Sequence, residues 1–300
     1  MTYFDLYQSG ELLRRVRDAY VRLAACDLCP HECGANRIKG ELGFCGAGFL
    51  PKLASANIHT GEEPPISGSK GSGTIFLTGC SLKCRFCQNF PISQLGNGEE
   101  ITTMKLAQRM LGLQKRGAHN INFVTPTHYL PQILSAIWLA VPKGFRLPIV
   151  WNSSGYEKVE ALQLLDGIVS VYLPDMKYAD DNAAVTFSSA PGYSEINRLA
   201  VSEMLRQVGH LQVDMNGVAV SGLVIRHLVL PDKLSGTHET LDWIADCLGT
   251  ETHISLMRQY FPAHLAVKTS GINRKITDEE YEESAGFLEE AGLENGWLQN

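Results

Sequence analysis

TIFLTGCSLKCRFCQN, residues 74–89, joins an apolar, strand-like run to a loop with three closely spaced cysteines. Cys80, Cys84 and Cys87 follow a C-x3-C-x2-C spacing, which leaves one iron of a [4Fe–4S] cluster without a protein ligand. A zinc site usually pairs two Cys or His knuckles and closes at four ligands, so a zinc site with a distant fourth ligand is the weaker alternative. The spacing and its place after a strand therefore predict a cluster with one open iron.

An open iron on a low-potential cluster is what the reductive cleavage of S-adenosylmethionine (SAM) requires. The amine and carboxylate of the methionine part can chelate that iron and hold the sulfonium beside the electron source. Phe86, between the last two cysteines, can cover one face of the cluster or of the adenine. We therefore expect a radical SAM enzyme. The alternative from another class is a zinc- or iron–sulfur-binding module without catalysis.

The composition fits a globular cytoplasmic protein. Three hundred residues, 44% of them hydrophobic, are enough for a large core. A formal charge of −6 without any Lys/Arg tract argues against non-specific nucleic-acid binding. The longest apolar stretch, residues 133–141, is too short to span a bilayer, and the first residues lack a signal-peptide core. We expect neither a nucleic-acid nor a membrane partner.

The chain has a second group of cysteines near its N-terminus. In a cytosolic protein, cysteines indicate metal or catalytic sites before disulfides. Four thiolates with C-x2-C-x3-C-x11-C spacing suit zinc or a second [4Fe–4S] cluster, and His31 could replace one of them. The group consists of Cys26, Cys29, Cys33 and Cys45. Cys247 shares a helical pattern with Leu241 and Ile244 and is predicted to be a packed core thiol.

From residue 74 onward, β-rich runs alternate with helical patterns. The predicted strands are 74–78, 120–125, 147–152, 167–173, 223–230 and 253–260. The predicted helices are 10–25, 103–116, 131–141, 156–165, 194–208 and 240–248, with a last helix after a capping box at Thr277 and Glu280. Asn216-Gly217 predicts a hairpin tip before the fifth strand. Such parallel βα units fit a doubly wound sheet or an open part of a (βα)8 barrel, and periodicity does not choose between them.

Polar residues gather after the predicted strands, where ligands bind in parallel sheets and barrels. The candidates are Thr125, Thr127, Asn152, Ser154, Asp175, Lys177 and Arg226. The alternative is that they cap helices or form surface pairs. We expect two domains: residues 1–60 as an N-terminal helix with a Cys-rich metal-binding module, and residues 61–300 as the βα domain that carries the site.

GCSLKCRFCQN, FVTPTHY (123–129), WNSSGY (151–156) and PDMKY (174–178) together resemble the radical SAM superfamily. Within it, the chain from about Cys26 onward is similar to pyruvate formate-lyase activating enzyme-like proteins. The resemblance implies a partial (βα)6 TIM-like barrel of parallel strands, with a small Cys-rich module, the cluster at the barrel mouth and SAM across the strand ends.

The resemblance also implies roles for individual residues. FVTPTHY lies where the superfamily usually has a Gly-Gly-Glu element that binds the methionine amine, which this sequence lacks. Backbone carbonyls near Thr125 and Thr127 would then take that role. WNSSGY, with Asn152 and Ser154, resembles the third-strand segment. Residues implied to help hold SAM further along the chain are Asp175, Lys177, Arg226 and His238, the last as a ribose contact.

The implied chemistry is hydrogen abstraction by a 5′-deoxyadenosyl radical, with flavodoxin or ferredoxin as the reductant. In activating enzymes the substrate is a glycine Cα of a partner protein, so a protein or peptide substrate is the first expectation. Loop 178–193 could dock such a partner or serve as a lid. The alternative within the same chemistry is a small molecule or a peptide side chain.

Overall fold

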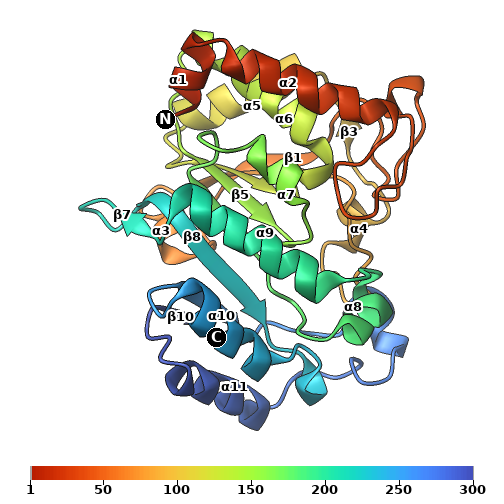
Figure 1. Cartoon of the computed structure of the whole chain (residues 1–300), viewed down its shortest axis with the longest axis vertical. Helices are drawn as coiled ribbons and strands as arrows, with labels where there is room; N and C mark the ends of the chain where they lie inside the picture. The colour runs from red at the N-terminus through yellow and green to blue at the C-terminus, as the bar shows by residue number, and fades with distance from the viewer. Residues whose placement is uncertain (1, 300) are drawn as a thin grey trace.

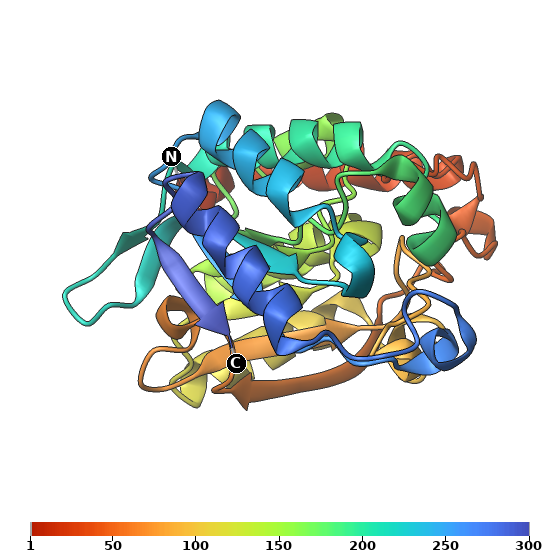
Figure 2. The ribbon, with the colours of Figure 1, turned by 90° about the horizontal axis from the view of Figure 1, so that it is seen from below.

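A curved sheet of parallel strands forms the centre of this computed structural model, which describes residues 2–299. Six strands lie side by side, and each neighbouring pair is parallel. In sheet order they are β2 (Ser72–Leu77), β4 (Ile121–Val124), β5 (Ile149–Ser153), β6 (Val171–Pro174), β8 (Ala219–Leu228) and β9 (His253–Met257). They are the six predicted strands, and the fold is the expected partial TIM-like barrel (Figures 1 and 2).

Three strands at the sheet edges were not predicted. β1 (Lys52–His59) runs antiparallel to β2, and β3 (Glu99–Glu100) pairs with β1. β10 (Gly296–Gln299) adds a parallel strand beside β9. The side chains of β1 are mostly exposed or half-buried, so its sequence lacks the apolar run that marks a central strand. β1 falls within the predicted N-terminal segment 1–60, yet it belongs to the barrel sheet.

Helices cover the outer face of the sheet (Figure 2). Outward side chains such as Phe123, Trp151 and Ile225 are fully buried and belong to the main core. The longer helices are α2 (Glu11–Val21), α5 (Thr103–Lys115), α6 (Leu130–Ala140), α9 (Tyr193–Val208), α10 (Thr237–Leu248) and α11 (Asp278–Glu290). The shorter ones include α1 (Tyr3–Gln8) and α7 (Val159–Gln163). Within residues 2–299, no helix combines the length and the apolar character needed to cross a membrane.

Two local predictions are confirmed. β7 (Gln212–Val213) pairs antiparallel with the start of β8, and the turn between them contains Gly217 at φ +73°. A left-handed backbone at this position favours glycine. The capping box is also present, because Thr277 accepts a hydrogen bond from the Glu280 amide while the Glu280 carboxylate accepts one from Thr277.

Two other expectations need correction. Cys247 is exposed, because α10 buries the stripe of Leu241, Ile244 and Leu248 and leaves residue 247 on the solvent side. The segment 178–193 is not a plain loop: it contains helix α8 (Asp181–Ser188), capped by the Asp180 carboxylate.

The capping box provides a test of local stability. Thr277→Ala removes the side-chain acceptor at the start of α11, and we expect it to lower the free energy of unfolding by about 1 kcal/mol. A urea midpoint that falls with an unchanged m-value would show this. Thr250→Ala, at an exposed turn, is the matched control. Equal midpoints for the two variants would contradict the stabilising role of the cap.

Candidate functional site

One cavity lies at the carboxyl ends of the parallel strands and brings the cysteine loop together with polar strand-end residues. The cysteines and the polar strand-end residues both line this cavity, although Cys80 and Arg226 are 146 positions apart in the chain. The predicted residues that line it are Cys80, Cys84, Cys87, Thr125, Asn152, Ser154, Asp175, Lys177 and Arg226. Ligands of parallel barrels bind at this edge, so the cavity is the candidate active site.

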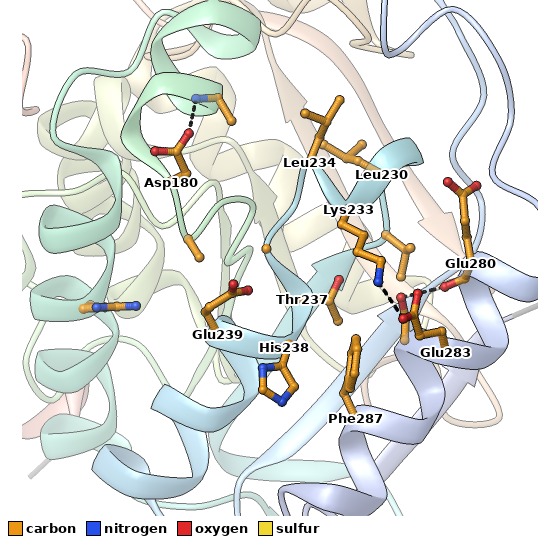
Figure 3. Close-up of a pocket in the computed structure, with 16 residues that line it drawn as sticks. Asp180, Leu230, Lys233, Leu234, Thr237, His238, Glu239, Glu280, Glu283 and Phe287 are labelled. Carbon is orange, nitrogen blue, oxygen red and sulfur yellow. Dashed lines mark hydrogen bonds and ion pairs between the residues drawn. The ribbon is translucent and has the colours of Figure 1, made fainter.

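Two predicted residues are not brought to this cavity. The Thr127 hydroxyl donates to the buried Glu157 carboxylate at 2.8 Å, behind the strand ends. His238 lies at the start of α10, where it packs edge-on against Phe287. It lines a separate surface pocket between α10 and α11 (Figure 3). His238 does lie in a helix start as expected, since α10 begins at Thr237, but this first turn faces the outer pocket and not the cavity.

Each thiol of the cysteine loop has a hydrogen-bonding partner. The Leu82 amide donates to Cys80 Sγ at 3.3 Å, and the Ser188 hydroxyl donates to Cys84 Sγ at 3.0 Å. Cys87 Sγ lies 3.2 Å from the Ser93 hydroxyl. Hydrogen bonds to sulfur tune the potential of a cluster that the sulfurs bind. Ser188 is the last residue of α8, and nothing in the surrounding sequence indicated that it would donate a hydrogen bond to Cys84.

The loop is otherwise enclosed by aromatic and aliphatic side chains. Phe86 is buried and meets Tyr260 edge-on, with ring centroids 5.6 Å apart. Cys80 and Cys84 pack against the same apolar cluster. Burial raises the pKa of the Cys84 thiol to about 11, although Lys177 opposes the shift. Burial also raises the pKa of Cys80. As free thiols these groups are neutral, and a bound metal would be needed to deprotonate them near neutral pH.

A buried charge cluster forms the opposite wall of the cavity. The Asp175 carboxylate accepts from Lys177 Nζ at 2.5 Å and from Arg226 Nε at 2.8 Å. Arg226 Nη2 also donates to the Asn152 side-chain oxygen at 2.8 Å. Burial alone would raise the pKa of Asp175, but the two cations lower it below its usual value. The Glu62 and Glu63 carboxylates lie close enough to Arg226 to stabilise its charge as well, whereas Asp175 is the ion-pair partner of Lys177.

Two features of the cavity wall suit a polar ligand. The Ser154 hydroxyl is buried without any hydrogen-bond partner among the described residues. Thr125 has φ +53°, a strained conformation for a β-branched residue. Its amide donates to the Asn152 carbonyl at 2.8 Å, so β5 holds this turn in place. Strained residues and unsatisfied buried groups concentrate at binding sites.

Two residues of α9 form hydrogen bonds with the strand ends from the outer side of the sheet. The sequence pattern predicted that they belong to a helix but did not indicate these contacts. The Tyr193 hydroxyl accepts from the Lys177 amide at 3.0 Å and lies 2.9 Å from the Ser154 carbonyl oxygen. The Asn197 amide donates to the carbonyl oxygens of Gly155 and Asp175. A Cβ added at Gly155 would lie 2.1 Å from Asn197 Nδ2, so this approach requires glycine.

The four N-terminal cysteines lie in one loop region next to the site. Cys26, Cys29 and Cys45 are buried, whereas Cys33 is exposed. Burial raises the pKa of Cys29 to about 12. His31 does not face solvent freely: Nε2 lies 2.7 Å from the Ser81 carbonyl oxygen. Within residues 2–299, no group of three or more His, Cys, Asp or Glu side chains is gathered closely enough for a single metal ion.

The fold and site define an α/β protein whose partial barrel carries a three-thiol loop at its strand ends. Over 278 residues the chain is 32% identical to the uncharacterized protein MJ0674 of Methanocaldococcus jannaschii, covering 90% of this chain and 75% of that one. The chain belongs to the same family as MJ0674. No protein-family profile matches it.

The fold is shared with HydG, a maturase of the [FeFe]-hydrogenase, at a TM-score of 0.52 and 12% identity. The alignment covers 75% of this chain and 51% of HydG, so the chain spans about half the length of that protein. A structure of Streptococcus suis SuiB is also similar, with a TM-score of 0.48, 11% identity, and coverage of 76% and 48% of the two chains. At such identities the likeness concerns the fold alone.

The charge cluster provides a test of the site's architecture. Asp175→Asn removes the shared ion-pair partner of the half-buried Lys177 and Arg226, and we expect it to lower the free energy of unfolding by about 3 kcal/mol near neutral pH. Because the folded-state pKa of Asp175 is lowered, its contribution is full above the unfolded pKa of about 3.9 and is lost as pH falls through the folded value. Urea midpoints across this pH range measure the difference.

Asp166→Asn is the matched control, since Asp166 pairs with Arg206 in an exposed ion pair. Exposed pairs contribute about 0–1 kcal/mol. A variant at Asp175 no less stable than this control at neutral pH would show that the carboxylate does not hold the strand ends together.

Proposed function

We propose that this chain is a radical SAM enzyme in which Cys80, Cys84 and Cys87 hold a [4Fe–4S] cluster. The observation that carries this proposal is that these thiols line one cavity with the polar strand-end residues. Cluster and SAM, when bound, supply a 5′-deoxyadenosyl radical that abstracts hydrogen from a substrate. The chain's own residues bind and orient both groups and exclude water from them.

The donor set fits the cluster. Three thiolates can bind three irons of a [4Fe–4S] cluster, which leaves the fourth iron for SAM. The Leu82 amide and the Ser188 hydroxyl donate hydrogen bonds to two of these sulfurs. Lys177 lies close enough to Cys84 for its charge to favour the thiolate. The buried Phe86 packs beside the half-buried cysteines of the loop and covers part of it.

The opposite wall fits the polar end of SAM. Lys177 and Arg226 present positive charge that suits a carboxylate, and Asp175 holds both cations in place. The free Ser154 hydroxyl offers a further hydrogen bond. In place of the missing Gly-Gly-Glu element, backbone carbonyls of the strained turn at Thr125, which lines the cavity, would bind the methionine amine.

We further propose that the substrate is a polypeptide, with a backbone glycine of a partner protein as the first candidate. The 3-10 helix η6 (His264–Lys268) borders the cysteine loop, because the Ala266 amide donates to the Arg85 carbonyl at 2.8 Å. Leu265 and Val267 on this segment are half-exposed, as is Phe261 just before it. We call these three side chains the apolar rim. An apolar rim beside the site suits a polypeptide loop better than a small polar metabolite.

SAM cleavage is the first test of the proposal. Anaerobically reconstituted protein with dithionite should release 5′-deoxyadenosine and methionine, whereas Cys84→Ala should release at least a thousandfold less, because it removes a cluster ligand. Cys247→Ala is the matched control, since Cys247 is exposed on α10. Chromatography of the products measures both. Product from Cys84→Ala at the wild-type rate, or none from a properly assembled wild type, would overturn the radical SAM proposal.

The substrate class needs a separate test. Extract of the source cells should stimulate 5′-deoxyadenosine release through its macromolecular fraction, and protease treatment of that fraction should abolish the effect. A double variant of the apolar rim, Leu265→Asp with Val267→Asp, should lower the stimulation several-fold, whereas Val213→Asp on the distant hairpin should not. Stimulation by the low-molecular-weight filtrate alone would favour a small-molecule substrate and contradict the polypeptide proposal.

A further inference from the structure

The N-terminal region buries a cation that has no acidic partner. Arg37 has an exposed fraction of 0%. Its Nε and Nη2 donate to the Gly48 carbonyl at 2.9 and 2.7 Å, and Nη1 donates to the His128 carbonyl at 2.7 Å. Within residues 2–299, no carboxylate forms an ion pair with this guanidinium. Since an uncompensated buried charge costs several kcal/mol, some other anion should lie beside Arg37.

The groups beside Arg37 are the N-terminal cysteines. Nη1 lies 3.9 Å from Cys26 Sγ, and the charge of Arg37 also acts on Cys45. Neutral thiols provide no counter-charge. Thiolates bound to a metal do, because metal binding releases the thiol protons and leaves an anionic centre. The burial of Arg37 is therefore explained if these cysteines hold a metal.

The contact of these thiols with the barrel site favours a cluster over zinc. Gly43 lies between two of the thiols, since a Cβ at this position would be 3.3 Å from Cys33 Sγ and 3.4 Å from Cys45 Sγ. Four thiolates suit either zinc or a four-iron cluster. Zinc has no redox chemistry, whereas an iron–sulfur cluster beside a second redox site can carry electrons to it.

This thiol group is in direct contact with the cysteine loop of the barrel. The Cys80 amide donates to the Cys45 carbonyl at 3.2 Å, so a ligand of one group is hydrogen-bonded to a ligand of the other. A Cβ at Gly79 would lie 2.5 Å from that carbonyl oxygen, and only glycine permits the contact. His31 adds a second contact through the Ser81 carbonyl.

We propose that Cys26, Cys29, Cys33 and Cys45 hold a second [4Fe–4S] cluster, with Arg37 as its buried counter-cation, and that this cluster passes electrons to the barrel cluster across the Cys45–Cys80 contact. The transfer half of this inference rests on the proposed radical SAM function. A one-electron donor of the flavodoxin or ferredoxin class loses one electron to the N-terminal cluster, beside the exposed Cys33. That electron then moves to the barrel cluster, and no bond forms or breaks.

Metal content tests the site without reference to activity. After anaerobic reconstitution, the wild type should contain about eight irons per chain, because each cluster has four. A double variant, Cys26→Ser with Cys29→Ser, should retain about four. A triple variant, Cys80→Ala with Cys84→Ala and Cys87→Ala, should also retain about four. Zinc with no iron in the triple variant would overturn the proposal.

The two proposals fail separately in this experiment. Four irons in the triple variant support the N-terminal cluster whether or not the wild type cleaves SAM. If the double variant lacks iron while the triple variant retains it, the N-terminal cluster is supported and the barrel cluster is contradicted. If the triple variant lacks iron while the double variant retains it, the N-terminal cluster is contradicted and the barrel cluster is supported.

The role of Arg37 is tested by the reduction potential of the N-terminal cluster in the triple variant. Arg37→Met should lower the potential, because a nearby positive charge stabilises the more negative reduced cluster, whereas Arg37→Lys should largely restore it. Redox titration followed by electron paramagnetic resonance measures both. Equal reduction potentials with and without Arg37→Met, at equal iron content, would contradict the role of Arg37 as the counter-cation of the cluster. If Arg37→Met does not fold, Arg37→Gln in the same comparison takes its place.

Proximity of the clusters has a readout of its own. With both clusters reduced, the wild-type spectrum should show magnetic coupling and differ from the sum of the double- and triple-variant spectra. A wild-type spectrum equal to that sum would contradict electron transfer across the Cys45–Cys80 contact.

Discussion

The Asp175 carboxylate fixes the mouth of the barrel. It accepts hydrogen bonds from Lys177 at its own strand end and from Arg226 on β8, and Arg226 extends the network to Asn152 on β5. Three strands that are distant in sequence are thereby held at one level. Without this carboxylate, two half-buried cations would repel each other at the place where the strand ends must converge. The charge cluster forms one wall of the cavity.

Helix α9 also holds the strand ends in place, from the outer side of the sheet. Tyr193 and Asn197 on α9 bind the backbone of residues 154–155 and 175, not their side chains. Gly155 at φ +68° allows this helix to come so close. Side chains at the strand ends are therefore free to face the cavity, while their backbone is held by the helix. A rigid frame with free polar groups is what a binding site needs.

How much the sequence could predict depended on how local each signal was. The cysteine spacing and the polar residues after strands are local, and the structure places Asp175 and Lys177 beside the cysteine loop as expected. The ribose role of His238 came from the resemblance alone, and the sequence could not show that the first turn of α10 faces an outer pocket. The prediction for Cys247 was wrong because i, i+3, i+6 drifts off the buried stripe of a helix.

Other features had no local signal at all. Thr127 follows its strand as the true cavity residues do, but it turns away to satisfy Glu157, a buried carboxylate that also accepts from Trp151 and Ser153. A sequence does not show which of two neighbouring threonines serves the ligand and which serves the core. Arg37 stands in a glycine-rich loop, and no local pattern marks it as buried. Only the fold shows that it is fully buried.

The two thiol groups share an electrostatic feature, a cation close to one of their sulfurs. Each group lies beside a cation, the fully buried Arg37 at Cys26 and the half-buried Lys177 at Cys84. Lys177 is paired with Asp175, whereas within residues 2–299 Arg37 has no acidic partner. If both thiol groups hold clusters as proposed, their thiolates would stabilise these cations. The Cys45–Cys80 hydrogen bond would then bring the two anionic centres together, and the charge of one would affect the affinity of the other for an electron.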